Sequence, residues 1–276
     1  MTELRTLQLT ELDILKEIKR VCDKNNIKYF LIGGTLLGAA RDGKFIPWDD
    51  DIDIGMLREE FDKFEKIANS ELDKKYFFQT PVTDEECGTY CCGRVRLEGS
   101  YFASNSTPKH WKHNGIFVDI LPYDKVTKNK FFARMFFYYF NVISRVYWKR
   151  LKYTPHPANK LFRIIMNVSS ALYSIVPTKI LKKKLEKYHK KYMNLKEYER
   201  IEMLNQHPRA FKSELVEELG TMQFEGVEFT IPKNYDEYLS NQYGDWRILP
   251  PVEQQIPHHL DFSITGVNGT GGVTND

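Results

Sequence analysis

Hydrophobic residues recur at helical spacing in two stretches near the start of the chain. In the first stretch the apolar positions are Leu12, Ile14, Leu15, Ile18, Val21 and Cys22. This pattern predicts a helix with one face in a core, capped by Thr10 and ending near Asn25 and Asn26. In the second stretch, 58–68, the predicted inward positions are Phe61, Phe64, Ile67 and Ala68. Two amphipathic helices are therefore expected in the first 70 residues.

A strand followed by a glycine pair is predicted between these helices. The run 28–32 is mostly aromatic and aliphatic, which is typical of a buried strand. Gly33 and Gly34 end this strand, and Thr35 opens a short helix through Ala40. Backbone amides without side chains can approach a phosphate closely, and a helix N-terminus favours an anion. A plain tight turn is the alternative interpretation of the glycine pair.

Acidic and aliphatic residues alternate in the next segment. Asp51 and Asp53 alternate with Ile52 and Ile54. On a strand, both carboxylates would project from one face while both isoleucines enter the core. Two carboxylates so close repel each other unless a divalent cation neutralises them, and Mg²⁺ or Mn²⁺ suits all-oxygen ligands that include substrate phosphates. The pattern predicts a metal site and a phosphate-bearing substrate, with a solvated acidic turn as the alternative.

A calcium-binding EF-hand fits the same acidic spacing only in part. Asp49, Asp51, Asp53 and Glu60 occupy suitable positions, but Ile54 stands where the loop requires glycine. The segment that precedes these residues contains Pro47 and does not have a helical pattern. The EF-hand interpretation is therefore set aside.

Other apolar runs predict the remaining strands. They lie at 76–80, 93–97, 115–121 and 227–231, and a short helix is predicted at 235–242. Asp119 lies inside the third of these runs, where an isolated carboxylate would be costly. Asp119 is therefore either a hydrogen-bonded core residue, or a third metal ligand or general base beside Asp51 and Asp53.

The middle of the chain, from about residue 131 to 192, is basic and aromatic. Its helical pattern is interrupted by Pro155, Pro157 and Pro177. Between Lys128 and Lys191 the local charge is +15, and the rest of the chain carries −12. Such a segment could dock on an anionic lipid surface, with an ordinary solvated helical face as the alternative. The sequence carries no nucleic-acid-binding motif that would favour a nucleic-acid partner.

Composition narrows the class of protein. The 276 residues are 42% hydrophobic and 28% charged, enough to form a sizeable core, which excludes a disordered chain or a disulfide-rich miniprotein. The first twenty residues lack the apolar run of a signal peptide, and the longest apolar stretch, 164–176, is too short and too polar to cross a bilayer. With only four cysteines, a reducing cytoplasm is the expected location, with peripheral contact at the inner face of the cell membrane.

Several blocks of the sequence resemble the LicD-type phosphotransferases, a family related to fukutin and fukutin-related protein. The blocks are GGTLLGAAR at 33–41, FIPWDDDIDIG at 45–55, FVDI at 117–120, YGDW at 243–246 and LPP at 249–251. The resemblance is dense over 29–57 and sparse elsewhere. It implies an α+β fold with a nucleotidyltransferase-like mixed sheet. The expected organisation is a catalytic core at 1–127, a basic aromatic helical segment at 128–200, a C-terminal mixed part that completes the site at 201–262, and a flexible tail at 263–276.

The resemblance also implies an activity. A metal-dependent phosphotransferase of this type moves phosphocholine from CDP-choline to a sugar hydroxyl of a cell-surface polysaccharide, of the teichoic acid or lipo-oligosaccharide type, and releases CMP. The expected partners are a CDP-alcohol and a lipid-linked or polymeric glycan. Transfer of ribitol, glycerol or ethanolamine phosphate, true nucleotidyl transfer, and glycan binding without catalysis are the alternatives.

Residue roles follow from the same resemblance. Asp51, Asp53 and Asp119 are expected to be catalytic and to bind Mg²⁺ or Mn²⁺. The expected substrate-binding residues are Gly33, Gly34, Thr35, Arg41, Lys44, Asp49 and His258. The resemblance also raises a zinc site at Cys87, Cys91 and Cys92, although an adjacent pair departs from ordinary zinc spacing and buried cysteines are the alternative. His258 and His259 form either a substrate contact or a surface pair.

Overall fold

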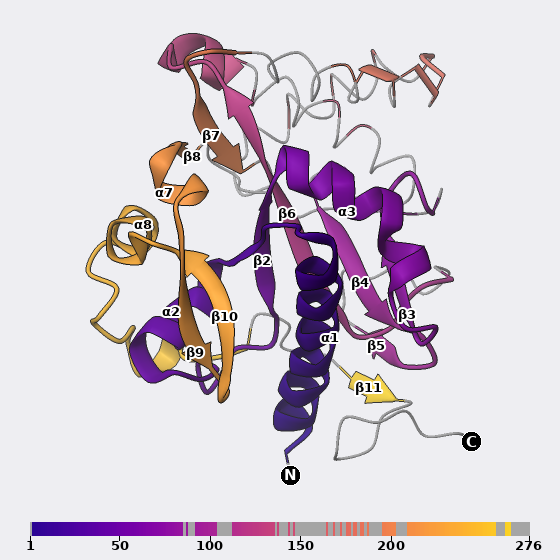
Figure 1. Ribbon diagram of the computed structural model, residues 1–276, viewed down its shortest axis with the longest axis vertical. Helices are drawn as coiled ribbons and strands as arrows, with labels where there is room; N and C mark the ends of the chain where they lie inside the picture. The colour runs from indigo at the N-terminus through magenta and orange to yellow at the C-terminus, as the bar shows by residue number, and fades with distance from the viewer. Residues whose placement is uncertain are drawn as a thin grey trace.

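The computed structural model describes most of the chain. It covers residues 2–84, 92–103, 112–135, 195–202 and 209–257, with shorter pieces at 87, 137, 143, 146, 164, 168, 172, 175–177, 179–180, 183–184, 187 and 263–265. Helices and a mixed sheet share one hydrophobic core (Figure 1). The predicted α+β class is confirmed.

A seven-stranded mixed sheet forms the centre of the protein. Five of its strands lie in the order β1 (Phe30–Leu31), β2 (Asp53–Leu57), β6 (Phe117–Val126), β4 (Gly93–Leu97) and β3 (Tyr76–Gln79). Strands β2 and β6 pair in parallel, whereas the other described pairs of this sheet are antiparallel. The second half of β6 pairs with β7 (Glu199–Glu202), and β7 pairs with β8 (Arg209–Lys212). The strand predicted at 115–121 is therefore longer than expected and continues to Val126.

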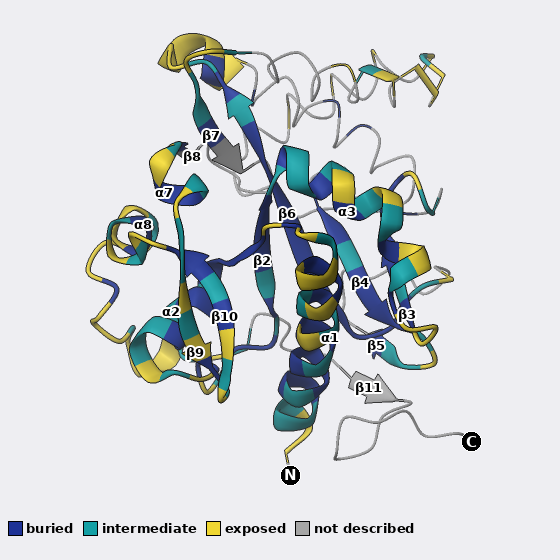
Figure 2. Ribbon diagram, viewed as in Figure 1, coloured by how far each residue is buried: buried dark blue, intermediate teal, exposed yellow. Residues whose placement is uncertain are grey.

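Helices α1 (Glu3–Asn25) and α3 (Arg58–Glu71) pack on one face of this sheet (Figure 1). Phe61, Phe64 and Ala68 of α3 are buried, as predicted, and Ile67 packs at the edge of the core. The inner side of α1 is buried along most of its length (Figure 2). These two helices enclose the apolar face of the sheet.

The predicted cap of α1 is wrong. Helix α1 begins eight residues earlier than expected, and the Thr2 side chain accepts the hydrogen bond from the Arg5 amide at its start. Thr10 lies inside the helix, where its hydroxyl donates to the Thr6 carbonyl. Leu7 is fully buried and extends the apolar stripe toward the N-terminus. The buried apolar stripe therefore starts before Thr10, and the helix itself starts about two turns before it.

A smaller layer beside β1 joins residues from both ends of the chain. Helix α2 (Gly33–Asp42) packs against β9 (Leu219–Phe224), which forms an antiparallel hairpin with β10 (Val227–Pro232). Two short helices, α7 (Glu214–Glu217) and α8 (Tyr235–Tyr243), lie next to this hairpin (Figure 1). The predicted strand at 227–231 and helix at 235–242 are confirmed. The hairpin thereby supports α2, which carries the glycine pair.

Three further short elements are described, and residues 130–135 are helical. Strand β5 (Tyr101–Ala103) pairs with β11 (Ser263–Thr265), and a short 3₁₀ helix, η1, spans Val252–Gln254. In the late YGDW block, the Trp246 indole is buried and donates to Asp236 of α8. This block therefore packs into the core and is tied to the first turn of α8.

Much of the basic middle segment lies outside the described residues. This applies to Tyr138, Tyr139, Tyr147, Trp148, Lys149, Arg150, Lys152, Tyr153 and Lys182, and to the tail from residue 266 onward. Among the residues that are described, no helix has the length and apolar character needed to span a bilayer.

Candidate functional site

The N-terminus of α2 lies directly against two carboxylates. Helix α2 starts at Gly33, which has a positive φ of 57°. A Cβ atom on Gly33 would lie 3.2 Å from the nearer carboxylate oxygen of Asp53, and a Cβ on Gly34 would lie 2.5 Å from Oδ2 of Asp49. The glycine pair therefore leaves room for these carboxylates, and the positive end of the helix dipole favours their charge.

Backbone hydrogen bonds fix α2 relative to β2. The Asp53 amide donates to the Thr35 hydroxyl at 3.0 Å, and the Ile32 amide donates to the Asp53 carbonyl at 3.2 Å. Thr35 is buried. Thr35, expected to bind substrate, thus also locks the start of α2 to the start of β2.

The acidic loop before β2 brings three carboxylates together. Ligand oxygens of Asp49, Asp50 and Asp51 all lie within 4.8 Å of one another, the one such group of possible metal-binding side chains among the described residues. Strand β2 begins at Asp53, so Asp51 lies just before the strand and not in it. The expected alternation persists, because Ile52 and Ile54 are fully buried while Asp51 and Asp53 are half-buried.

Asp53, Asp119 and Arg94 form a row across three adjacent strands. Asp119 of β6 is in register with Asp53 of the parallel strand β2 and with Arg94 of the antiparallel strand β4. The Arg94 guanidinium donates to both oxygens of Asp119, at 2.7 and 3.3 Å, and packs 4.3 Å from the Phe117 ring centroid. Asp119 therefore lies beside Asp53, as predicted, but an arginine pairs with its carboxylate.

Burial and mutual repulsion control the charge of the acidic loop. Burial, with Asp51 and Asp50 close by, raises the pKa of Asp49 to about 8. The Oδ2 atom of Asp49 is buried and has no hydrogen-bond partner in the described part of the chain. A group of oxygens with an unsatisfied buried acceptor suits a hard divalent cation. The residues present therefore fit the Mg²⁺ or Mn²⁺ that the sequence predicts.

A second buried carboxyl belongs to this site. Glu11 of α1 is 2% exposed, and its Oε2 atom has no hydrogen-bond partner among the described residues. Burial, followed by the charges of Asp51, Asp49, Asp50 and Asp53, raises the pKa of Glu11 well above its ordinary value. Sequence reasoning missed this residue, although an acidic residue inside the apolar stripe of a core helix is a signal that could have found it.

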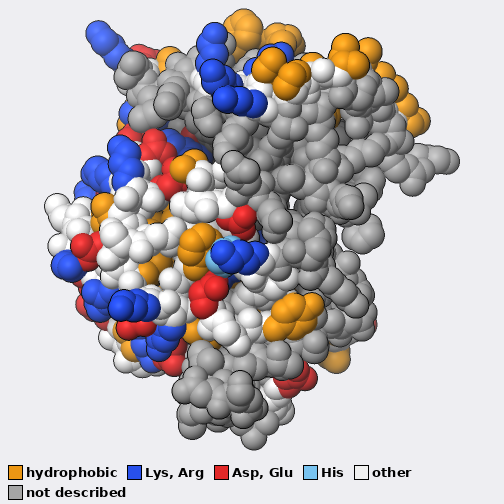
Figure 3. Space-filling view, turned by 90° about the vertical axis from the view of Figure 1, so that its right-hand side faces the viewer, with side chains coloured by type: hydrophobic (Ala, Val, Ile, Leu, Met, Phe, Trp, Pro, Cys, Tyr) orange, Lys and Arg blue, Asp and Glu red, His pale blue; other side chains and the backbone are white. Residues whose placement is uncertain are grey.

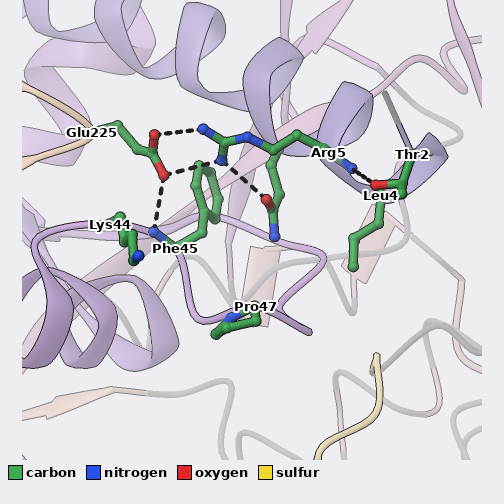
Figure 4. Close-up of a pocket in the computed structure, with 8 residues that line it drawn as sticks. Thr2, Leu4, Arg5, Lys44, Phe45, Pro47 and Glu225 are labelled. Atoms are coloured by element: carbon green, nitrogen blue, oxygen red, sulfur yellow. Dashed lines mark hydrogen bonds and ion pairs between the residues drawn. The ribbon is translucent and has the colours of Figure 1, made fainter.

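The predicted basic residues lie in the last turn of α2 and just after this helix. Arg41 is in the last turn of α2, roughly 10 Å along the helix from Gly34, and pairs with Asp42 at 2.9 Å. Lys44 lines a pocket of about 330 Å³ whose wall also includes Arg5, Glu225 and Pro47 (Figure 4). Gln8 lines this pocket too, and its amide donates to the Asp49 carbonyl at 2.8 Å. The pocket therefore adjoins the acidic loop.

Two charged residues form an ion pair in the wall of this pocket. Arg5 of α1 donates to both carboxylate oxygens of Glu225, at 3.0 and 2.7 Å, and Glu225 also accepts from the Phe45 amide at 3.2 Å (Figure 4). Glu225 sits in the β9–β10 turn with a positive φ of 51°. The ion pair therefore joins the first helix, the segment before the acidic loop and the C-terminal hairpin.

The remaining sequence predictions concern two histidines and three cysteines. His258, His259 and Cys91 lie outside the described residues. Cys87 and Cys92 are both buried, and the Cys92 sulfur lies 3.9 Å from Asp119 Oδ1. Cys92 is therefore next to the row of Asp53, Asp119 and Arg94.

Comparisons with known proteins find similarity to phosphotransferases. Residues 26–161 match the family model described as "LicD/FKTN/FKRP, nucleotidyltransferase domain". The chain is 30% identical over 270 residues to the lipopolysaccharide cholinephosphotransferase LicD of Haemophilus influenzae. The aligned stretch covers 93% of this chain and 96% of that protein. It is also 31% identical over 103 residues to the mouse ribitol 5-phosphate transferase FKRP, covering 37% of this chain and 18% of FKRP.

The matched region contains the glycine pair, the acidic loop and Asp119, which are the parts that the structure brings together. The similarity to the bacterial enzyme extends over nearly the whole of both chains. The chain therefore belongs to the LicD family of phosphotransferases.

Proposed function

We propose that this phosphotransferase moves phosphocholine from CDP-choline to a sugar hydroxyl of a cell-surface polysaccharide, of the teichoic acid or lipo-oligosaccharide type, and releases CMP. The observation that carries the proposal is the group of carboxylates against the N-terminus of α2, with a buried Asp49 oxygen that lacks a hydrogen-bond partner among the described residues. The choice of choline rests on the near full-length similarity to a cholinephosphotransferase.

In the proposed reaction, the acceptor hydroxyl attacks the phosphorus that carries choline. The bond from this phosphorus to the bridging oxygen breaks, CMP leaves with that oxygen, and the hydroxyl proton passes to a base. When bound, a divalent cation supplies charge neutralisation at the donor phosphates. Asp51 and Asp53 would hold the cation, with Asp49 and Asp50 beside them. Positioning by these residues would provide most of the rate enhancement.

Asp119 is proposed to be a third ligand or the general base. Its bidentate pair with Arg94 means that it can take either role only if Arg94 shares or releases its carboxylate. A phosphate group in the site would offer Arg94 another anion with matching geometry. Arg94 is therefore proposed to exchange between Asp119 and a donor phosphate. Gly33, Gly34, Thr35, Arg41 and Lys44 remain proposed substrate contacts.

A donor panel tests this proposal against the alternatives. Purified protein with Mg²⁺ or Mn²⁺ and candidate glycans would be incubated with CDP-choline, CDP-ribitol, CDP-glycerol or CDP-ethanolamine, and CMP would be measured. We expect the fastest CMP release with CDP-choline. Faster CMP release with CDP-ribitol would favour the FKRP-like reaction. Transfer of a nucleotide to the acceptor would indicate a nucleotidyltransferase. Glycan binding without CMP release would indicate a binding protein.

We further propose that part of the basic segment contacts an anionic membrane, where a lipid-linked glycan would be presented. Several large hydrophobic side chains are exposed there: Phe131, Phe132, Met135, Ile164, Val168, Leu172, Ile175 and Ile180. Exposed basic residues accompany them: Lys128, Lys130, Arg134, Lys179, Lys183 and Lys187. Figure 3 shows hydrophobic side chains gathered along the top of the molecule, near Lys and Arg side chains. Apolar side chains flanked by positive charge complement an anionic lipid surface.

Vesicle sedimentation tests this contact. We expect binding to vesicles that contain phosphatidylglycerol, weaker binding at high salt, and little binding to phosphatidylcholine alone. Leu172→Ser with Ile175→Ser should reduce binding without loss of stability, because these side chains are 71% and 88% exposed. Absent binding, or equal binding to both vesicle types, would contradict the contact.

A further inference from the structure

Glu11 is a buried carboxyl on a helix that otherwise packs into the core. It is 2% exposed and belongs to α1, whose buried face also contains Leu7, Leu15 and Ile18. Replacement of a core leucine by a carboxyl at such a position is costly, because an ionised group loses its hydration and even a neutral one requires hydrogen-bond partners. A compensating interaction is therefore expected at this position.

The helix places Glu11 beside the acidic loop. Gln8 lies one turn earlier on the same face of α1, and its side-chain amide donates to the Asp49 carbonyl at 2.8 Å. The charged groups that act on Glu11 are the four aspartates at 49, 50, 51 and 53. Glu11 therefore lies close to the loop that carries the proposed cation ligands.

Two buried carboxyl oxygens have no hydrogen-bond partners among the described residues. They are Oε2 of Glu11, on the helix beside the acidic loop, and Oδ2 of Asp49, in the loop itself. Most buried polar atoms in folded proteins have a partner, so two such acceptors associated with one acidic loop call for a positive group nearby. A protein amine or guanidinium would appear as a hydrogen-bond donor to these oxygens, and no described residue acts in this way. A divalent cation with oxygen ligands fits this environment.

We propose that Glu11 is a member of the divalent-cation site, and that it contacts the cation through a water molecule, next to the Asp49, Asp50 and Asp51 group whose oxygens lie within 4.8 Å of one another. This inference rests on the proposed cation site of the acidic loop. It extends that site to α1, which lies before the region 26–161 matched by the family model. The cation would then tie α1 to the loop and to the start of α2.

Direct cation binding tests the proposal without any turnover. The affinity for Mn²⁺ would be measured by electron paramagnetic resonance for the full chain and for Glu11→Gln, Asp51→Asn and Asp13→Asn. Asp13 lies on the same helix, its side chain is 42% exposed, and its substitution removes the same charge, so it is a matched control. We expect affinity to fall by about tenfold or more in Glu11→Gln and to be unchanged in Asp13→Asn.

A second readout separates binding from folding. Mn²⁺ should raise the Tm of the unsubstituted protein by a larger amount than that of Glu11→Gln, since ligand binding to the folded state stabilises it. Glu11→Met is a further variant of similar length that leaves no buried polar atom, and it should fold and lose cation affinity in the same way. If Glu11→Gln does not fold, the affinity of Glu11→Met decides the question.

The outcomes distinguish this inference from the function on which it rests. If the unsubstituted protein binds no Mn²⁺, or if Asp51→Asn binds it equally well, the proposed cation site in the acidic loop is wrong. If Asp51→Asn loses Mn²⁺ while the Glu11 variants bind it as the unsubstituted protein does, the cation site stands and the role of Glu11 is wrong.

Discussion

Substitution of Gly34 by alanine adds one methyl group at the contact between α2 and the acidic loop. The new Cβ would lie 2.5 Å from Asp49 Oδ2 and 3.2 Å from its Cγ, whereas ordinary contact begins at 3.4 Å. The Asp49 carbonyl is held by Gln8 at 2.8 Å. The Asp49 carboxylate must therefore shift by nearly an ångström within a loop that is anchored at its backbone.

The expected effect is on catalysis and not on folding. A displacement of about 1 Å in a catalytic site can lower the rate roughly 100-fold, equivalent to about 2.7 kcal/mol. Alanine is favoured over glycine inside a helix by about 1 kcal/mol, which offsets part of the strain. We expect kcat/KM for CMP release to fall about 100-fold while Tm changes by only a few degrees.

Gly43→Ala is the matched control at the other end of α2. Gly43 has a positive φ of 68°, and no atom lies within 4 Å of the position of an added Cβ. This variant should lose about 1–2 kcal/mol of stability because alanine is strained in that conformation, with little change in kcat/KM. The reasoning would be refuted if Gly34→Ala kept its activity within a few-fold, or if the two variants lost activity and stability in the same proportion.

Three further predictions follow from contacts around the site. Arg94→Lys keeps the positive charge but loses the two parallel hydrogen bonds to Asp119. We expect kcat/KM to fall about tenfold while the affinity for Mn²⁺ stays unchanged. An unaltered kcat/KM would argue against a role for Arg94. Glu225→Gln should destabilise the protein by about 1 kcal/mol at pH 7 in urea unfolding, because Glu225 accepts charge-assisted bonds from Arg5 and a bond from the Phe45 amide. These bonds lower the pKa of Glu225 below its ordinary value of 4.5. Its contribution to stability is therefore present above that pH and is lost as the pH falls through the lowered pKa, and a stability gap between the two proteins that does not narrow as the pH is lowered would contradict this. Cys22 is fully buried, and burial raises the pKa of its thiol. Brief treatment of the native protein with iodoacetamide should therefore leave Cys22 unmodified, as judged by peptide mass mapping. Rapid labelling of Cys22 without unfolding would contradict the described core.

Local patterns were sufficient to predict most elements of the fold. The alternation of Asp51 and Asp53 with two isoleucines predicted a core-facing aliphatic side and an acidic side. Both are present, although β2 begins only at Asp53 and the acidic side is half-buried. The start of α1 was predicted too late because Thr10 has the chemistry of a cap, whereas the apolar stripe continues to Leu7 and Thr2 caps the helix. Local chemistry identifies candidate caps, but tertiary burial decides which one is used.

The site was less accessible from the sequence because its partners come from distant segments. The register between β2, β6 and β4 places Arg94 next to Asp119, and no pattern within one segment specifies that pair. Glu11 acts on the acidic loop through helix packing across some forty residues of sequence. The glycine pair was interpreted as a phosphate contact, and in the fold it also receives Asp49 and Asp53. Long-range pairing therefore determines which charges meet.

The most direct test of the account is cation-dependent CMP release by Asp51→Asn beside the unsubstituted protein. Both proteins would be assayed with CDP-choline and a glycan acceptor, with Mn²⁺ and again with EDTA, after their Tm values have been compared. We predict that EDTA stops release by the unsubstituted protein, and that Asp51→Asn folds normally but releases CMP at least about 100-fold more slowly. Release that continues in EDTA, or an undiminished rate in Asp51→Asn, would contradict a phosphotransferase site built on the acidic loop.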